Sequence, residues 1–382
     1  MRIALLTDGI WPYVLGGMQK HSYYLCKYLA QQEVYVDLFH YNRSSYDISS
    51  LHYFSDQERK YISSHVIEAP TSFPFPGHYI YNSYRHSKLI YEAIKDKLHL
   101  YDFIYTKGFT GWYLIDKKYR KQITCAPIGV KFHGYEMFQK PPDIKTRLQH
   151  LFLLQWPVRL ISLRADVVFS YGGKISGIIR SLGVPDSKIF ELPSGVEQSV
   201  ICTEIKPTQG KINFLYLGRY ERRKGIEELN EVINELDKVG ILNKMVINFI
   251  GPIPVNRQIK NPSIIYHGEI RDRDTLQTLI RQNDVLLCPS WSEGMPNVIL
   301  EAMANGLAVL ATDVGATNVL VNSETGWLIE SPKLENLLAA VKLVMEYDPK
   351  AIDQKKKNAL HLIENNFTWE KLILKFKKRF IN

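Results

Sequence analysis

Short apolar runs alternate with stretches of helical periodicity along the chain. The opening RIALLT and the run VYVDLF at residues 34–39 are almost entirely apolar, which is typical of strands covered on both faces of a parallel sheet. Between them, GGMQKHSYYLCKYLAQQ carries apolar residues at helical spacing behind a glycine pair. Strand, turn, helix and strand together predict a βαβ unit.

The same alternation continues and then starts afresh in the second half. Further strands are expected near Asp102, Pro127 and Asp166. The polar segment CTEIKPTQGK at residues 202–211 disfavours regular structure because it contains Pro207 and Gly210. A second series of strands is predicted at residues 212–217, 245–250, 264–267, 284–288 and 308–311. Helices are expected to start near Lys224, Asp272 and Pro296.

The chain is long enough for two domains. Its 382 residues exceed the roughly 250 to 300 at which a single hydrophobic core usually stops growing. We predict two doubly wound α/β domains, over residues 1–195 and 196–366. The last segment, 367–382, has the pattern of an amphipathic helix that could pack on either domain. Ligands of such sheets bind beyond the carboxyl ends of the strands, so we expect the chemistry in a cleft between the domains.

Composition narrows the class of protein. The four cysteines lie far apart without a histidine cluster, which indicates buried reduced thiols rather than a metal site. The opening apolar run is too short for a signal peptide. The longest apolar stretch, residues 151–163, is shorter than a spanning helix and is interrupted by Pro157 and Arg159. We therefore expect a cytoplasmic protein without a transmembrane segment.

The positive charge is concentrated in the first half. Residues 1–200 hold 24 Lys+Arg and 17 Asp+Glu, so +7 of the net +9 lies there, which indicates an acidic substrate or surface. Arg147, Trp156, Arg159 and Arg164 surround the apolar stretch, and they motivate the hypothesis that this half touches an anionic membrane. The alternative is a helix buried in its own domain. No nucleic-acid partner is expected.

Two features of the first half are candidates for the site. Gly16 and Gly17 lie between the first strand and its helix, where backbone N–H groups can approach an anion. A purely structural turn explains such a pair equally well. His133 is expected at the end of the strand APIGVKF, where it is a candidate acid, base or sugar ligand. The alternative is a hydrogen-bonded surface histidine. Neither G-x-G-x-x-G nor a P-loop occurs.

A cationic cluster opens the second half. In LYLGRYERRKG, Arg219 directly follows a strand and Lys224 begins the next helix. Two cations near a helix N-terminus suit a diphosphate, whose departing charge they would stabilise. Arg222 and Arg223 leave the alternative open that the run is a solvated face.

The segment SEGMPNVILEAMANG is the most informative one. Glu293 lies in a loop bounded by Gly294, Pro296 suits the first turn of a helix, and Glu301 falls inside that helix. The N–H groups of Met295, Asn297 and Val298 would point at a ligand above the helix end. Carboxylates can accept from vicinal hydroxyls, which suits Glu301 to a ribose and Glu293 to a sugar. The alternative for either acid is a helix cap or an exposed charge.

Asp272 and Asp274 spell D-x-D, which could hold a divalent metal beside a diphosphate. We instead interpret Asp272 as the N-cap of a helix and Asp274 as a first-turn residue. No metal is therefore expected.

These segments resemble the retaining glycosyltransferases of family 4, which have the two-domain GT-B fold. The resemblance covers nearly the whole chain. It rests on the segments GGMQKHSYYLCKYL, KFHGYE, LPSGVE, LGRYERRKGIEEL and EGMPNVILE with AMANGLAVLATDVGATNVLV behind it. Met295 departs from the family, which often has Phe there. In the family the last helix crosses back to the N-terminal domain, so we assign residues 367–382 to it.

The resemblance also implies roles for the residues. Arg219 and Lys224 would hold the donor diphosphate, Glu301 the ribose, and Glu293 with the backbone of Gly294 to Val298 the transferred sugar. His133 would meet that sugar from the other domain. Gly16 and Gly17 would line the cleft near the phosphate, and the backbone at Ile270 would face the nucleobase.

The implied reaction moves a sugar from a nucleotide diphosphate sugar to a glycan or lipid-linked acceptor in polysaccharide or glycoconjugate synthesis. The anomeric configuration would be retained, and the departing phosphate would help to deprotonate the acceptor. Neither a side-chain nucleophile nor a cofactor or metal is then required. The alternatives are an epimerase or phosphorylase of the same fold, or a nucleotide-sugar binding protein without turnover.

Overall fold

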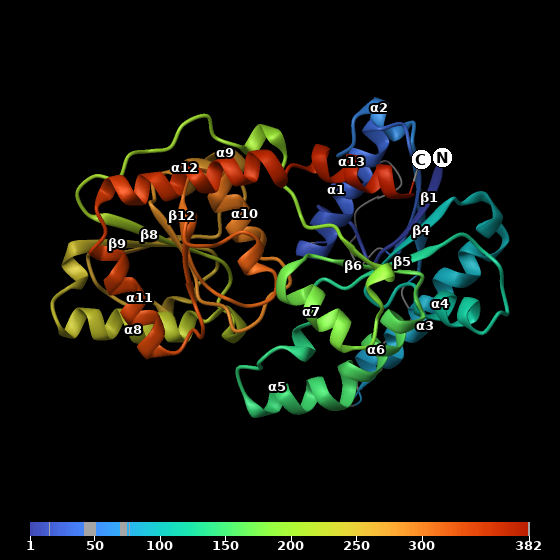
Figure 1. Cartoon of the computed structure of the whole chain (residues 1–382), viewed down its shortest axis with the longest axis horizontal. Coiled ribbons are helices and arrows are strands. Elements are labelled where there is room, and N and C mark those ends of the chain that lie inside the picture. Colours follow the sequence, from blue (N-terminus) through green and yellow to red (C-terminus); the bar gives the residue numbers. More distant parts are fainter. Residues whose placement is uncertain (15, 42–50, 69–74, 76, 381–382) are drawn as a thin grey trace. The chain divides into compact units, whose positions relative to one another are not determined.

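The structure is a computed structural model that describes residues 1–14, 16–41, 51–68, 75 and 77–380. The chain forms two compact units (Figure 1). Unit 1 comprises Met1–Phe138, Lys145–Ser194 and Trp369–Asn382, and unit 2 comprises Gln139–Ile144 and Gly195–Thr368. Residues 381 and 382 of the predicted last helix lie outside the described residues.

Unit 1 is built on a parallel sheet in the order β3-β2-β1-β4-β5-β6-β7. The strands are β1 Arg2–Leu6, β2 Tyr35–Tyr41, β3 Ile62–Ile67, β4 Phe103–Lys107, β5 Ile128–Lys131, β6 Val167–Ser170 and β7 Ile189–Glu191. The order reverses between β1 and β4, which is where sheets of this kind place their ligands.

Helices cover this sheet. They are α1 Gly17–Gln31, α2 Asp56–Arg59, α3 His78–Ile94, α4 Trp112–Tyr119, α5 Ile144–Gln149, α6 Gln155–Arg164, α7 Gly173–Ser181 and α13 Trp369–Phe380. A π-helical turn, His150–Leu154, joins α5 to α6. The first residue of α5 is grouped with unit 2.

The last helix, α13, packs on α1 and completes the core of unit 1. The ring of Trp369 stacks on Tyr24 and Tyr28 at centroid distances of 5.6 and 6.2 Å. The helix begins at Trp369 rather than at Phe367, because the backbone before it pairs with unit 2. The N–H of Val196 donates to the Phe367 carbonyl at 2.8 Å.

Unit 2 has a second parallel sheet, in the order β10-β9-β8-β11-β12-β13. Its strands are β8 Ile212–Leu217, β9 Met245–Ile250, β10 Ile264–Gly268, β11 Val285–Cys288, β12 Ala308–Thr312 and β13 Gly326–Ile329. Its helices are α8 Ile226–Lys238, α9 Arg273–Arg281, α10 Asn297–Ala304, α11 Leu334–Met345 and α12 Pro349–Asn366. In Figure 1, α8 and α11 lie below this sheet, and α9, α10 and α12 lie above it. The predicted fold class, two doubly wound α/β domains, is confirmed.

A buried ion pair fixes the segment that leads into β8. Lys356 and Asp284 are 0% and 1% exposed, and their Nζ and Oδ1 atoms are 3.0 Å apart. Lys356 also donates to the carbonyl of Lys206, and Thr208 Oγ1 donates to Asp353 of α12 at 2.8 Å. The pair is fully hydrogen-bonded, so losing either partner would leave a buried charge.

Candidate functional site

The site of unit 2 is built where the adjacent strands β8 and β11 end. Gly225 links a 3₁₀ turn, Arg222–Lys224, to α8 in a left-handed conformation with φ of 69°. A side chain there would meet the Pro289 carbonyl oxygen at 1.7 Å. Glycine therefore lets the turn approach the loop after β11 closely, and this approach brings Lys224 to Glu293.

Lys224 and Glu293 form the centre of this site. Lys224 Nζ lies 2.6 Å from Glu293 Oε1, although the two residues are 69 positions apart. Glu293 also accepts from Ser290 Oγ at 2.8 Å and from Arg223 Nη1 at 3.4 Å. Its side chain is only 7% exposed, whereas that of Lys224 is 22% exposed. The structure therefore brings Lys224 and Glu293, two of the residues proposed from the sequence, into one cluster.

Electrostatics keep Glu293 ionised. Burial alone would raise the pKa of this carboxyl, but the charges of Lys224 and Arg223 outweigh burial and lower the pKa below its usual value. The site therefore holds a carboxylate and two cations in one place. In such a cluster, Lys224 or Arg223 can give up its hydrogen bond to Glu293 and bind an incoming anion instead.

Arg223 and Ser290 are site residues that the sequence did not reveal. Within the run of basic residues, Arg222 pairs with Glu228 and lies over the Trp291 ring at 5.5 Å, so it has a structural role. Arg223 points instead to Glu293 and to the Ser292 carbonyl at 3.1 Å. The solvated-face interpretation of this run is therefore wrong for both arginines.

Arg219 is linked to this centre through Glu221, which also lies 3.5 Å from Arg223. The Arg219 side chain is 71% exposed and pairs with Glu221 at 2.8 Å rather than with Glu293. Ile270 lies in the loop between β10 and α9.

The loop of Glu293 leads directly into α10. Gly294, Met295 and Pro296 are buried, and Asn297 and Val298 are half-buried. Pro296 is the N-cap of α10 and not a first-turn residue, because its ψ of 108° is extended. The cap makes no side-chain hydrogen bond, and the first turn carries no acid. Glu301 lies inside α10, as predicted.

A second glycine holds this loop in place. Gly315 has φ of 57°, and a side chain there would meet the Glu293 carbonyl oxygen at 2.1 Å. Ala316 N–H donates to the Gly294 carbonyl at 2.8 Å. The backbone of the EGMP segment is therefore fixed by the segment that follows β12.

In unit 1, His133 does not end β5, which stops at Lys131. It lies two residues beyond, and its Nδ1 is 2.8 Å from the hydroxyl of Tyr171, which follows β6. Burial raises the pKa of Tyr171, and a hydrogen bond from Ser194 lowers it only in part, so the phenol remains protonated. A phenol that donates to Nδ1 leaves the imidazole proton on Nε2.

Two buried lysines end the neighbouring strands β4 and β5. Lys107 and Lys131 are register partners at the ends of β4 and β5, and both are 1% exposed. Burial lowers the pKa of each well below its usual value. Lys107 Nζ is 2.6 Å from His21 Nδ1, and Lys131 Nζ lies 4.1 Å from the centroid of the Tyr171 ring.

Gly16 and Gly17 begin α1, as predicted. Gly16 is the N-cap, and its carbonyl accepts from Lys20 N–H at 2.9 Å. The helix has neither a side-chain cap nor an acid in its first turn. A backbone N-terminus therefore lies where the sheet order reverses.

The D-x-D pair has the capping roles that we assigned to it. Asp272 accepts from Thr275 N–H at 2.8 Å as the N-cap of α9, and Asp274 lies in its first turn. Hydrogen bonds from Thr275 lower the pKa of Asp272. Among the residues that the structure describes, three or more His, Cys, Asp or Glu do not gather into a possible metal site.

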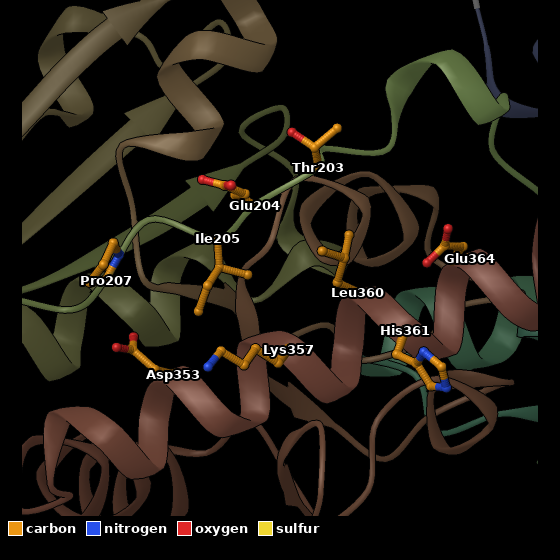
Figure 2. Close-up of a pocket in the computed structure, with 9 residues that line it drawn as sticks. All are labelled: Thr203, Glu204, Ile205, Pro207, Asp353, Lys357, Leu360, His361 and Glu364. Carbon is orange, nitrogen blue, oxygen red and sulfur yellow. The ribbon is translucent and has the colours of Figure 1, made fainter.

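A pocket of about 500 Å³ lies elsewhere in unit 2, between an extended segment and α12 (Figure 2). Its lining consists of Thr203, Glu204, Ile205, Pro207, Asp353, Lys357, Leu360, His361 and Glu364. It contains none of the predicted donor-binding residues. Within the described parts of the chain, every helix is too short or too polar to cross a membrane.

Comparison with known proteins identifies the family. Residues 15–200 match the family described as Glycosyltransferase Family 4, and residues 211–346 match the one described as Glycosyl transferases group 1. The chain belongs to these glycosyltransferases. The two matches fall on unit 1 and unit 2 respectively, and the predicted family resemblance is confirmed.

Several similar proteins are also named as glycosyltransferases. The putative teichuronic acid biosynthesis glycosyltransferase of Bacillus subtilis is 32% identical over 46% of this chain and 46% of its own length. A galactosyltransferase of Escherichia coli, named UDP-Gal:alpha-D-GlcNAc-diphosphoundecaprenol alpha-1,3-galactosyltransferase, is 33% identical over 29% of this chain and 28% of its own length. Each alignment thus spans less than half of the curated relative.

A solved structure shows the same fold over the whole chain. Sucrose-phosphate synthase from Thermosynechococcus elongatus superposes with a TM-score of 0.77 at 18% identity, and the match covers 99% of this glycosyltransferase and 98% of the synthase. Both units therefore have the GT-B architecture that the sequence predicts.

Proposed function

We propose that this glycosyltransferase moves a sugar from a nucleotide diphosphate sugar to an acceptor hydroxyl, with retention of anomeric configuration and without a metal. The observation that carries the proposal is the cluster of Lys224, Arg223 and Glu293 at the carboxyl ends of β8 and β11. A departing diphosphate needs fixed cations, and Lys224 is held ready by a buried carboxylate. The uncapped start of α10 adds backbone N–H donors beside it.

In this reaction the bond between the anomeric carbon and the phosphate oxygen breaks, and its electrons leave with the diphosphate. Lys224 and Arg219 would neutralise that charge. The acceptor oxygen bonds to the same face of the carbon, and its proton passes to the departing phosphate oxygen. Because the phosphate takes the proton, the reaction needs no side-chain base.

The remaining residues would hold the donor. Glu301 would accept from the ribose hydroxyls and Glu293 from the sugar, while the backbone of Gly294 to Val298 binds sugar and phosphate. His133 would donate from Nε2 to the transferred sugar, and Gly16 and Gly17 would lie near the phosphate. The backbone at Ile270 would contact the base.

The acceptor would be a glycan or a lipid-linked saccharide in cell-surface polysaccharide synthesis. The names of two relatives support this proposal: one refers to teichuronic acid biosynthesis and the other to a diphosphoundecaprenol acceptor. On this proposal the enzyme works in the cytoplasm, at the inner face of an anionic membrane.

Donor turnover tests the proposal. Lys224→Ala and Glu301→Ala should each reduce release of nucleoside diphosphate by about 100-fold or more, because each removes a charged donor contact. Lys238→Ala, at the exposed far end of α8, is the matched control and should retain full turnover. Turnover should persist in excess EDTA, and NMR of the product should show the donor's anomeric configuration. Full activity of the Lys224 variant, or an inverted product, would contradict the proposal.

A further inference from the structure

The segment from α5 to α6 exposes a row of large apolar side chains in unit 1. Leu148, Leu151, Phe152 and Trp156 are 49%, 51%, 74% and 65% exposed. Leu148, Phe152 and Trp156 recur every four residues, as neighbours along a helix do. Val158 and Ile161 of the same segment are 0% and 1% exposed. The alternative of a helix buried in its own domain therefore holds for Val158 and Ile161 but not for Phe152 and Trp156.

Exposed aromatic side chains of α3 continue this row. Trp156 lies 6.4 Å from the ring of Trp112, and Trp112 lies 5.0 Å from Tyr84, which is 36% exposed. Phe109 joins the same cluster and contacts Tyr79, which is 58% exposed. We call the exposed surface of Leu148, Leu151, Phe152, Trp156, Tyr79 and Tyr84 the aromatic face.

The charges around this aromatic face are mostly positive, and the acid near Tyr84, Asp116, is paired with Arg120 and Arg164. Residues 145–164 contain Lys145, Arg147, Arg159 and Arg164, and neither Asp nor Glu occurs among them. Of these, Arg164 is paired with Asp116, whereas Lys145, Arg147 and Arg159 are exposed. In α3, Arg85 and Lys88 likewise precede the first acid, Glu92.

We propose that the aromatic face inserts into the surface of an anionic lipid membrane. Tyrosine and tryptophan rings suit the boundary between headgroups and acyl chains, and the surrounding lysines and arginines match anionic headgroups. Pairing with a second copy is disfavoured, because it would bring basic rims of the same sign together. Membrane insertion would give the enzyme access to a membrane-held acceptor, and this purpose, though not the insertion itself, rests on the proposed function.

Vesicle flotation tests this surface on the full-length protein. Wild type should float with vesicles of phosphatidylcholine and phosphatidylglycerol, and it should stay behind with phosphatidylcholine alone or at high salt. Phe152→Ser with Trp156→Ser should lower the partition coefficient by about tenfold or more, because two inserted rings are lost. Lys145→Glu and Arg147→Glu should each lower it by at least about fivefold.

Matched controls come from unit 2. Val255→Ser removes an apolar side chain that is 83% exposed, and Lys238→Glu reverses a charge on a side chain that is 69% exposed. Both should float like wild type. Circular dichroism should be unchanged in all variants, because the altered side chains are exposed.

Three results would overturn the inference. They are no flotation of wild type, equal flotation of wild type and the double aromatic variant, or a wild-type dimer that the double variant converts to a monomer. The last result would assign the face to self-association. Donor hydrolysis without lipid, measured on the same variants, reports separately on the proposed function.

Discussion

Glu293 shows how a single buried acid can organise a site. It is only 7% exposed, yet Lys224, Arg223 and Ser290 all bond to its two oxygens. A bound diphosphate would compete with Glu293 for Lys224, so the carboxylate holds the ammonium in place until the ligand arrives. Buried carboxylates paired in this way stay charged at neutral pH.

We expect Tyr171 to determine which ring nitrogen of His133 carries the proton. Tyr171→Phe removes the 2.8 Å contact to Nδ1, so the imidazole loses its preference for a proton on Nε2. Nitrogen-15 NMR of His133 should show the Nε2–H form in wild type and a mixture in the variant. Turnover should fall by about threefold to tenfold, the value of one hydrogen bond.

Tyr135→Phe is the control for this prediction. Its hydroxyl is also buried in unit 1, but it bonds to Ser162 at 3.2 Å. An unchanged His133 spectrum in Tyr171→Phe would show that the tyrosine does not set the tautomer.

At the scale of elements, the turn between β8 and α8 decides where Lys224 lies. Gly225 and Gly240 both have φ of 69°, but an added side chain would meet the Pro289 carbonyl oxygen at 1.7 Å in the first and nothing within 4 Å in the second. Gly240→Ala should therefore lower the free energy of unfolding by about 1–2 kcal/mol, from backbone strain alone.

Gly225→Ala should cost clearly more than that control, because Pro289 must move as well. The variant should also weaken nucleoside diphosphate binding, because the turn that carries Lys224 shifts. Urea unfolding and calorimetry of both variants measure these effects. Equal losses in the two variants would mean that close approach at Pro289 is unimportant.

The sequence predicts a strand or helix correctly where its local pattern of apolar residues alone is enough to specify it. The apolar runs INFLYL and MVINFI correspond to β8 and β9 residue by residue. The edge strands β3 and β13 and the three-residue β7 escaped prediction. ISSHVI of β3 is half polar, only Ile62 of its six residues is buried, and its pairing with β2 depends on tertiary contacts.

The site was predictable to a similar extent. Lys224 and Glu293 stand out because each lies beside a glycine next to a strand end. Arg223 could not be separated from Arg222, since neighbouring basic residues look alike until their partners are known. Tyr171 is 38 positions from His133, and only the adjacency of β5 and β6 brings the two together.

For the whole molecule, buried histidines make stability sensitive to acid. Burial lowers the pKa of His40 in β2 from 6.5 to about 4. Between pH 6.5 and about 4, His40 binds a proton in the unfolded chain but not in the folded chain. The stabilisation is therefore complete above pH 6.5 and is lost as the pH falls towards 4, and it is worth up to about 3 kcal/mol.

His40→Gln should flatten the fall in melting temperature across this pH interval, because glutamine does not titrate and can still bond to Ser64. Calorimetry at a series of pH values measures this slope. His361→Gln, at an exposed position of unit 2, should keep the wild-type slope. The same steep slope in His40→Gln would exclude His40 as a cause.

The proposed sugar transfer depends on unit 2 binding a nucleoside diphosphate through Lys224. Titration calorimetry of UDP, GDP and ADP with wild type and with Lys224→Met measures this directly. We predict that wild type selects one of these nucleotides and that the variant binds it about 10-fold to 150-fold more weakly, as expected for one lost charge-assisted hydrogen bond. Equal affinity of the two proteins, or no binding of any nucleoside diphosphate by wild type, would contradict the account.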